Sequence, residues 1–345
     1  MPIISPDTWD SFVTAHPRAH LLQTSAWGDL KAAFGWTPVR VGLAENNGSL
    51  FAGVQLLFRR LPYHLGTLAY APYGPLVNWA DAAQVHALMA EVDRVAKQHR
   101  AAFLKIEPGF GLEGVDVAAY GFRPSPQTIQ PPRTVVLDIS GDDDTILSRM
   151  NQGTRRNIRK GEKFEVEIGY GTREDVAVFN ALLAETGSRD EFGVHTPDYY
   201  ERAYDLFVPQ GRAALILGSY AGQPLAGVMV FALGDQAWYL YGASSDRERQ
   251  RMASYGVQWA GIQWAKSTGA KTYDMYGVPD ADPETLEAQF ETRDDGLWGV
   301  YRFKRGWGGT VIRSVGAWDR VYNRLIYEAY RRVIGQRADG KCRAD

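Results

Sequence analysis

The chain has almost no cysteine and no long apolar run. Its one cysteine, Cys342, lies near the C-terminus, so it can form no internal disulfide, has no metal-ligand spacing and is a poor candidate for a nucleophile. No run approaches the roughly 18 apolar residues of a membrane span. The first residues, MPIISPDTWDSF, lack the basic start and apolar run of a signal peptide. We therefore expect a soluble, cytoplasmic protein without a bound metal.

A strong excess of charge of one sign is also lacking. The formal net charge of −2 excludes a generally basic nucleic-acid binder but leaves room for a local basic patch. Hydrophobic residues make up 45% of the chain and charged residues 23%, as in ordinary globular proteins. A length of 345 residues favours two domains over one.

The two halves of the chain repeat one order of elements. The first half predicts a helix, a hairpin that turns at 46–48 (Asn-Asn-Gly), a further strand, a helix over 81–99 and a strand over 102–106. The second half predicts three strands within 213–242, a helix over 254–268 and a final strand. Strand, strand, strand, helix, strand is the core order of acyl-CoA-dependent N-acetyltransferases (the GNAT fold). The sequence therefore predicts an α/β protein with mixed sheets, built from two tandem GNAT-like domains.

Composition places the boundaries of these domains. A proline-rich stretch over 124–132 is the predicted linker. We predict a first GNAT-like domain over 1–134, completed by 316–345, and a second over 135–315. The last helix is expected over 318–334 and should pack back on the first domain, because it follows the second copy.

The loops that would bind CoA are degenerate. GNAT enzymes hold the pyrophosphate of CoA on backbone N–H groups before the central helix, in a loop that contains glycine. The matching loop of the second half, 247–256, keeps arginines but lacks a Gly-x-Gly segment, and that of the first half, 77–81, has no glycine. We predict that acetyl-CoA is not the donor and that no cofactor is used.

One segment, WGVYRFKRGWGG at 298–309, surrounds a lysine with aromatics and ends in glycines. Lys304 lies between Tyr301, Phe303 and Trp307, where an ammonium can stabilise developing negative charge. The glycines let the backbone turn or approach a ligand. The alternative is a strand that ends in a turn, with Arg302 and Lys304 on its solvated face.

Eight segments resemble, in order and over nearly the whole chain, those of the Fem aminoacyltransferases, which build peptidoglycan interpeptide bridges. The segments are Gln23–Trp27 followed by Lys31, Tyr70–Pro75, Leu104–Pro108, Gln130–Arg133 with Val136–Asp138, Thr154–Arg159, Tyr239–Ser244, Tyr273–Gly277 and the Lys304 segment. Any one of them alone is weak, whereas eight in register are strong. No long charged heptad stretch is present, so the chain resembles members without the coiled-coil arm.

The resemblance implies two acyltransferase-like domains that act without CoA. Such enzymes transfer an amino acid from aminoacyl-tRNA to an amine of a cell-wall precursor, either UDP-muramyl-pentapeptide or its lipid-linked form. The precursor is expected on the first domain and the aminoacyl-tRNA on the second. A lipid-linked acceptor is compatible with peripheral membrane contact, and relatives of this build can work as monomers. The sequence identifies neither the donated amino acid nor the acceptor residue.

The resemblance also implies residues that bind the precursor. Lys31 follows the Gln-Thr-Ser-Ala-Trp motif, and its charge suits a pyrophosphate or a carboxylate; the alternative is an exposed helical lysine. The family has an arginine and, four residues later, a tyrosine, where this chain has His195 and Tyr199. Histidine at this position weakens the expected phosphate contact. Tyr241, or else Tyr239, matches a tyrosine on the central strand of the family.

Catalytic residues follow from the same comparison. Lys304, with Phe303 beside it, matches the lysine near the reacting ester. Glu107 matches an acidic residue after a hydrophobic strand and could bind the acceptor ammonium and take its proton, or else be a structural carboxylate. Tyr73, in the matching turn, joins the expected precursor-binding residues.

The implied reaction is aminolysis of an activated ester, which needs no covalent enzyme intermediate. The sequence has no Gly-x-Ser-x-Gly elbow, in agreement with that mechanism. Positioning of amine and ester can supply about 7–11 kcal/mol. Lys304 would stabilise the oxyanion or the departing ribose oxygen.

Cationic residues gather where tRNA binding is expected. The stretch 149–163 contains six cations and one carboxylate, and four of those cations are expected to contact tRNA: Arg155, Arg156, Arg159 and Lys160. The alternative for this stretch is a solvated helix face, and we favour RNA contact over it. For the arginines of the last helix we favour the solvated face.

Two other functions compete with aminoacyl transfer from tRNA. One is a CoA-type N-acyltransferase that acts on another amine. The other is a non-catalytic protein that binds tRNA or the precursor.

Overall fold

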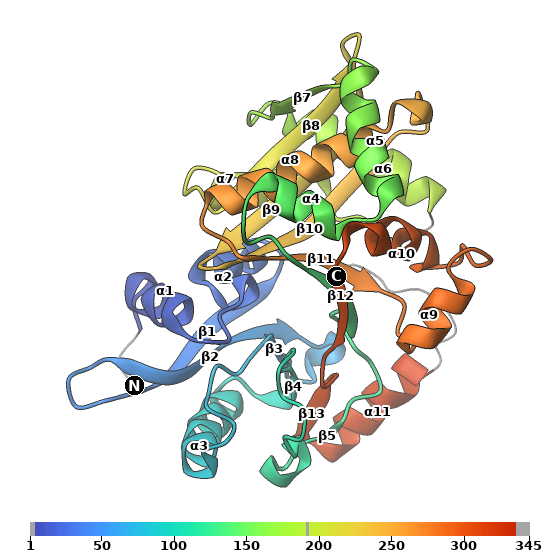
Figure 1. Ribbon diagram of the computed structural model, residues 1–345. Coiled ribbons are helices and arrows are strands. Elements are labelled where there is room, and N and C mark those ends of the chain that lie inside the picture. The colour runs from blue at the N-terminus through green and yellow to red at the C-terminus, as the bar shows by residue number, and fades with distance from the viewer. Residues whose placement is uncertain (1–3, 191–192, 336–345) are drawn as a thin grey trace. The chain divides into compact units, whose positions relative to one another are not determined.

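The computed structural model describes residues 4–190 and 193–335 (Figure 1). The chain divides into two compact units. The described part of the first unit runs to Pro132 and resumes at Arg313, and the second unit comprises Arg133–Ile312. Each unit has its own mixed sheet, so the predicted α/β architecture with two mixed sheets is confirmed.

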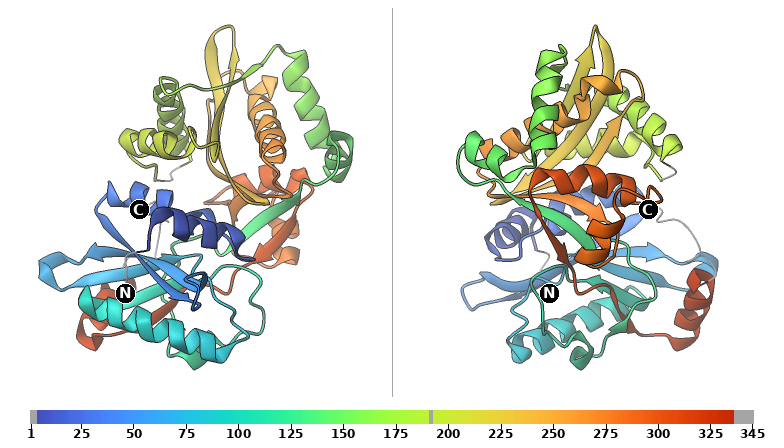
Figure 2. Two further views of the ribbon diagram at one scale, coloured as in Figure 1. Left: turned by 90° about the vertical axis from the view of Figure 1, so that its left-hand side faces the viewer. Right: turned by 45° about the vertical axis from the view of Figure 1, so that its right-hand side comes forward.

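The first unit is a sheet of six strands in the order β1-β2-β3-β4-β13-β5. Its helix α3 packs against β1, β2 and β4, and α1 and α2 lie over the opposite face (Figure 2). Its helices and strands are α1 (Pro6–Ala15), α2 (Ser25–Ala32), β1 (Trp36–Ala44), β2 (Leu50–Arg60), β3 (Thr67–Pro72), α3 (Ala82–Gln98), β4 (Ala101–Glu107), β5 (Arg123–Pro124), β13 (Trp318–Val321) and α11 (Arg324–Gly335).

Local signals explain why these elements form. β1 and β2 make the predicted antiparallel hairpin, and Gly48 takes the positive φ of 87° that its turn requires. Asp81 caps α3 by accepting a hydrogen bond from the backbone N–H of Gln84. The apolar face of α3, which includes Val85, Leu88 and Val92, then closes the core over the sheet.

The second unit is a sheet of seven strands in the order β12-β6-β11-β10-β9-β8-β7. Helix α8 packs against β8, β9 and β10, with α5 behind it, while α6 packs on the other face against β9 and β10 (Figure 2). The unit comprises β6 (Arg133–Asp138), α4 (Asp143–Arg149), α5 (Gln152–Lys163), β7 (Glu167–Tyr170), α6 (Val176–Arg189), α7 (Pro197–Phe207), β8 (Ala213–Tyr220), β9 (Gln223–Leu233), β10 (Gln236–Ser244), α8 (Ala253–Ser267), β11 (Thr272–Val278), α9 (Pro283–Gln289), α10 (Trp298–Lys304) and β12 (Thr310–Arg313).

Two predicted elements differ from the structure. The helix expected over 318–334 begins only at Arg324, because Trp318–Val321 form β13 and pair with β4. The alternative of a strand before the glycines at 306–309 is wrong, since Trp298–Lys304 are helical. In both segments closely spaced aromatic and basic residues fit a strand and a helix about equally well, and tertiary packing decides between them.

A buried ion pair joins the end of the chain to the first sheet. The Nζ of Lys105, on β4, lies 3.0 Å from the Oδ1 of Asp319, on β13, and both side chains are fully buried. Asp319 also accepts a hydrogen bond of 2.9 Å from the hydroxyl of Tyr327, on α11. Lys105 donates a second bond to the carbonyl of Gln127. Its ammonium therefore ties β4, β13 and the 125–127 segment together.

Removal of one partner of this pair should destabilise the protein strongly. We expect Asp319→Asn to lower the free energy of unfolding by about 3–5 kcal/mol, because it leaves the Lys105 ammonium buried without its counter-charge. The double variant Lys105→Met/Asp319→Leu should lose less than Asp319→Asn. Urea unfolding measures both, with Arg94→Met, at a half-exposed pair, as the control that changes stability by less than about 1 kcal/mol. An Asp319→Asn protein as stable as the wild type would contradict the prediction.

Candidate active-site residues

Lys304 is buried at the C-terminal end of α10, not solvated. Its side chain is 5% exposed, and its Nζ donates a hydrogen bond of 2.8 Å to the carbonyl of Gly277, on β11. The same Nζ lies 5.8 Å from the ring centroid of Tyr239, on β10. Burial lowers the pKa of Lys304 to about 7, against a smaller opposing effect of the Asp274 carboxylate. The amine is therefore poised between its charged and neutral forms at neutral pH.

Asp274 is the charged partner of this lysine within the sheet. Burial raises the pKa of Asp274 to about 6, while hydrogen bonds from the Thr134 hydroxyl and the Tyr276 N–H and the charge of Lys304 act in the opposite direction. The pairing of β11 with β6 shifts register between Asp274 and Gly277, and Tyr276 has a φ of +63°. This bulge brings the carbonyl of Gly277 to the ammonium of Lys304.

The strands beside Lys304 part from each other. β10 and β11 are parallel neighbours, but their pairing covers only Gln236–Trp238 against Thr272–Asp274. Both strands continue beyond that point, β10 to Ser244 and β11 to Val278. Beyond Asp274 the two strands are therefore no longer paired with each other, and Lys304 contacts both of them at this place. In the first unit the equivalent strands β3 and β4 stay paired from Thr67 to Pro72.

Phe303 and the glycines support the position of Lys304. The ring of Phe303 makes edge contacts with Tyr255 and Trp307, at 5.0 and 5.7 Å between ring centroids. Gly308 has a φ of +80°, and a Cβ there would lie 2.1 Å from the carbonyl oxygen of Arg149. The glycines thus let the chain turn closely against its own backbone.

Three expected precursor-binding residues form one aromatic cluster in the second unit. The ring of His195 stacks on that of Tyr199 at 3.8 Å between centroids, and the hydroxyl of Tyr241 donates to that of Tyr199 at 3.4 Å. Tyr200 completes the cluster, and its hydroxyl accepts the backbone N–H of His195. Tyr199 is only 2% exposed, and burial raises its pKa above the ordinary tyrosine value. Tyr199 therefore stays neutral, and its hydroxyl oxygen orients Tyr241 by accepting the hydrogen bond from it.

Glu107 lies in the first unit and is held by several donors. Its carboxylate accepts the backbone N–H groups of Ile129 and Gln130, the former at 2.6 Å, and the hydroxyl of Tyr70. Burial raises the pKa of Glu107, while the bonds from Tyr70, Ile129 and Gln130 and the charge of Lys105 act in the opposite direction. The carboxylate therefore has a structural role, because it holds the 129–130 segment beside the end of β4.

Tyr73 and Glu107 line one small pocket. Tyr73 has a φ of +49°, and its ring stacks on that of His20 at 3.5 Å between centroids. Gly109, Thr128 and Gln130 are among the other residues that line the pocket. Lys31 is not among them. Its Nζ lies 5.4 Å from the ring centroid of Trp27 in the preceding turn of α2.

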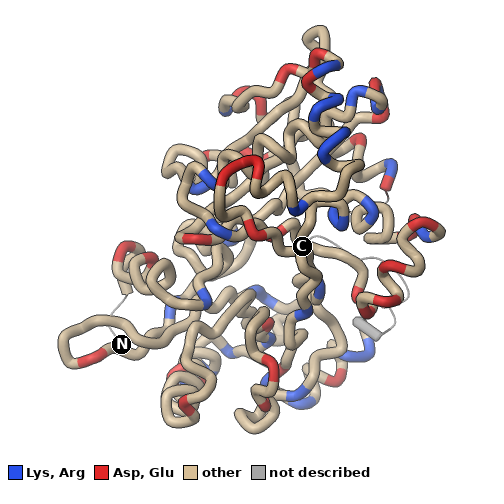
Figure 3. The backbone as a smooth tube through the Cα atoms, in the orientation of Figure 1, with Lys and Arg blue, Asp and Glu red and all other residues tan. Residues whose placement is uncertain are grey.

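The basic stretch predicted to contact tRNA is helix α5 (Figure 3). Arg156 and Arg159 are exposed on it. Arg155 instead donates to the carbonyls of Leu147 and Met150 at the end of α4, and Lys160 lies over the ring of Phe164 at 5.7 Å. Two of the four cations thus have structural contacts, and two project from the helix.

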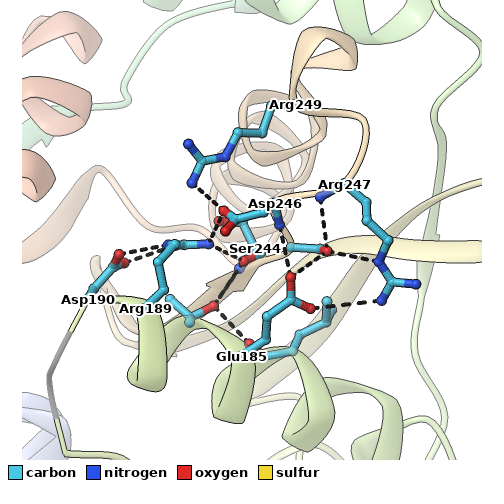
Figure 4. Close-up of polar contacts among 10 residues, drawn as sticks. Glu185, Arg189, Asp190, Ser244, Asp246, Arg247 and Arg249 are labelled. Atoms are coloured by element: carbon cyan, nitrogen blue, oxygen red, sulfur yellow. Dashed lines mark hydrogen bonds and ion pairs between the residues drawn. The ribbon is translucent and has the colours of Figure 1, made fainter.

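The loop that replaces a CoA cradle in the second unit is tied down by ion pairs (Figure 4). Asp246 pairs with Arg189, on α6, at 2.9 Å and with Arg249. Glu185 accepts the backbone N–H of Asp246 and the hydroxyl of Ser245. Two carboxylates therefore lie among the arginines of this loop, which makes it a poor pyrophosphate site.

Sequence reasoning assigned no role to Asp274, Thr134 or Gly277. The signal was present, because an aspartate within the apolar strand TYDMYG is unusual and needs a partner. Among the described residues, no group of three or more His, Cys, Asp or Glu could hold a metal ion. In the same part of the chain, no helix is long and apolar enough to cross a membrane.

Known proteins share this architecture over its full length. The chain is 26% identical over 400 residues to a lipid II:glycine glycyltransferase of Staphylococcus haemolyticus (strain JCSC1435), with 94% of this chain and 93% of the relative covered. The crystal structure of FemX superposes with a TM-score of 0.85 at 24% identity, over 95% of this chain and 98% of FemX. A tandem GNAT protein from the clavulanic acid biosynthesis pathway gives a TM-score of 0.51 at 13% identity, over 90% of this chain and 94% of that one.

These likenesses confirm the predicted fold of two tandem GNAT-like parts. The longest helix among the described residues, α3, has 17 residues, in agreement with a form that lacks a coiled-coil arm. The sequence model of the FemAB family matches residues 4–123, 114–221 and 218–334, and so covers nearly all of the chain. The predicted resemblance is therefore confirmed, and the chain belongs to the FemAB family.

Proposed function

We propose that this chain transfers an amino acid from aminoacyl-tRNA to an amine of a peptidoglycan precursor, and so builds an interpeptide bridge. As a member of the FemAB family, the chain is an aminoacyltransferase. The relatives that act on lipid II and glycine make a lipid-linked acceptor and glycine the first candidates for its substrates. The single observation that carries the proposal is the buried Lys304 at the point where β10 and β11 part.

The geometry at Lys304 supports placing the ester of the donor there. Aminolysis of an ester passes through a tetrahedral oxyanion and then releases a ribose oxygen, and a buried ammonium stabilises either charge better than a solvated one. The bond to Gly277 holds the Nζ in place before the substrate arrives. Asp274 keeps part of the amine population protonated near neutral pH. The lysine serves as cation and the carboxylate as its positioning group.

The acceptor is assigned to the first unit. The lining of the small pocket beside Tyr73 and Glu107 includes the polar residues Thr128, Gln130 and Ser314, and the Glu107 carboxylate is a group that suits an ammonium. We place the acceptor amine here and Lys31 at a more distant anionic part of the precursor. His195 and Tyr241, in the second unit, stay candidate precursor-binding residues on the resemblance alone.

The exposed cations of α5 support binding of the tRNA phosphates to this helix. Arg156 and Arg159 are free to meet a polyanion, and such contacts bind without reading sequence. The CoA-type alternative is less favoured, because the carboxylates of Asp246 and of Glu185, on α6, lie beside the loop where a pyrophosphate would bind. Aminoacyl-tRNA, whose phosphates would bind on α5 and not at the 247–256 loop, fits the chain better than acetyl-CoA.

Transfer should depend on intact tRNA. We expect radiolabelled glycine to pass from a mixed aminoacyl-tRNA pool to UDP-muramyl-pentapeptide or to its lipid-linked form, and the transfer to disappear after RNase treatment. Thin-layer chromatography of the labelled precursor measures it, and labelled mixtures of the other amino acids identify the donor. Label transfer that resists RNase, or acylation that requires acetyl-CoA, would move the assignment to the CoA-type alternative.

Removal of the Lys304 ammonium should slow the chemical step. We expect Lys304→Met to reduce the single-turnover rate by about 100–1,000-fold, the usual loss for one group that stabilises an oxyanion. The melting temperature should stay close to that of the wild type, since methionine fills a similar volume and needs no hydration. Arg302→Met, an exposed cation on the same helix, is the control and should keep its rate. An unchanged rate in Lys304→Met would favour a non-catalytic binding protein.

Loss of Asp274 should change the pH dependence of transfer. The carboxylate raises the pKa of Lys304, so Asp274→Asn should lower that pKa below about 7 and leave less ammonium at neutral pH. The rate of the variant relative to wild type should be near one below about pH 6 and fall as the pH rises through 7. This ratio cancels the ionisation of the acceptor amine, which both proteins share.

The matched control for Asp274→Asn is Asp295→Asn, an exposed carboxylate of the second unit that pairs with Arg293. Its rate relative to wild type should be the same at every pH. Single-turnover rates between pH 5.5 and 8.5 test the pair. A ratio for Asp274→Asn that stays constant over this range would remove Asp274 from its role as the positioning group of Lys304.

A further inference from the structure

The first unit exposes apolar side chains at one edge. Tyr63 is 90% exposed and Leu325 is 86% exposed, the two highest values among the large hydrophobic residues that the structure describes. Tyr63 lies in the turn between β2 and β3, and Leu325 lies at the start of α11. Figure 2 shows this turn and α11 at the same edge of the unit. Leu65, from the same turn, is 43% exposed.

A shallow groove connects these two segments. It is lined by residues of the β2–β3 turn, the end of α3 and the start of α11, among them Leu65, Lys97, Arg100, Asn323 and Ile326. Its lining contains two cations and no carboxylate. Arg60, at the end of β2, and Arg324, at the start of α11, are also exposed. The exposed side chains of Tyr63 and Leu325 therefore belong to a surface that also carries several positive charges.

Backbone hydrogen bonds hold the β2–β3 turn, the end of α3 and the start of α11 to the rest of the first unit. The N–H of Leu61 donates to the carbonyl of Gly66 at 2.9 Å, and that of Thr67 to the carbonyl of Arg100 at 3.0 Å. The N–H of Asn323 donates to the carbonyl of Ala102 at 2.8 Å. The side chain of Tyr63 is thus presented outward by a turn in which Tyr63 itself has a φ of 56°, a conformation that tyrosine rarely adopts.

We propose that this edge, formed by the β2–β3 turn, the groove and the start of α11, docks the protein on an anionic lipid bilayer. Tyrosine and leucine side chains enter the boundary between head groups and acyl chains, where an aromatic ring with a polar tip is favoured. Lys97, Arg100 and Arg324 then face the anionic head groups, which attract cations near the surface. The surface would hold the enzyme where a lipid-linked acceptor is found, but the docking itself does not depend on the transfer reaction.

Charge favours a bilayer over the other partners that could cover this surface. A second copy of the chain, related by a two-fold axis, would bury this surface against the same surface of its partner, with the cations of both copies in one interface and no carboxylate in the lining of either groove to pair with them. An RNA partner would use the cations but would leave Leu65 and Leu325 exposed to water. A bilayer with anionic head groups satisfies both the cations and the apolar side chains.

Sedimentation with vesicles tests the proposal. We expect the full chain to bind vesicles of phosphatidylcholine with 30% phosphatidylglycerol, and to bind pure phosphatidylcholine much less. Each cation at the surface contributes roughly a fivefold change in binding, so Lys97→Glu/Arg100→Glu should weaken the partition coefficient by more than about tenfold. Tyr63→Ser/Leu325→Ser should weaken binding at low and high salt alike.

The matched controls are Tyr170→Ser and Lys271→Glu, which change an exposed tyrosine and an exposed lysine of the second unit. Both should bind vesicles like the wild type. All four variants should transfer to the soluble UDP-linked acceptor at the wild-type rate, so that failure of docking and failure of catalysis are distinguished. Equal binding of the wild type to both kinds of vesicle, or binding by the edge variants equal to wild type, would overturn the proposal. So would a concentration-dependent dimer, or RNA binding, that these edge variants abolish.

Discussion

The ammonium of Lys304 is buried where two parallel strands of the second sheet part, and much of the surrounding structure serves to keep it there. Burial of an amine costs free energy unless the charged form meets acceptors and counter-charge. Here one bond to the Gly277 carbonyl and the field of Asp274 compensate only in part, which is why the pKa falls to about 7. A group held near this balance responds strongly to a new negative charge, as an oxyanion or a departing alkoxide would provide.

The two copies of the fold differ at the place where chemistry is expected. In the first unit β3 and β4 remain paired along their length. β4 ends in Glu107, whose carboxylate accepts hydrogen bonds from the backbone N–H groups of Ile129 and Gln130. In the second unit the pairing of β10 and β11 stops early, and a bulge turns a carbonyl toward a lysine from outside the sheet. The second sheet therefore has unpaired strand ends beside Lys304, whereas the equivalent strands of the first sheet stay paired.

The sequence predicted the regular part of the fold well, because hairpin turns, helix caps and alternating apolar residues are local signals. The 46–48 turn and the helix expected over 81–99 both occur, the latter as Ala82–Gln98. Residues 318–321 were assigned to a helix because their strand partner, β4, lies about 200 positions earlier in the chain. Resemblance predicted candidate site residues by type, including Lys304, and their roles stay predictions. The aspartate in the apolar strand was a signal for Asp274, but its link to Lys304 and the position of the Gly277 carbonyl were not predictable, because a bulge and the electrostatic field of a buried carboxylate arise only from tertiary packing.

The C-terminal segment gives the first unit a feature that the second lacks. β13 inserts between β4 and β5, and the Lys105–Asp319 pair fixes it through a buried charge on each side. The same segment continues into α11, whose start forms one wall of the groove beside the β2–β3 turn. The strand order of the first sheet, one wall of the groove and the exposure of Leu325 therefore depend on one late segment of the chain. Leu325 adds nothing to the core of the first unit because it is 86% exposed, whereas Tyr327, two residues later on the same helix, is buried against Phe103 of β4; the start of α11 thus turns one face to the core and another to the proposed docking surface.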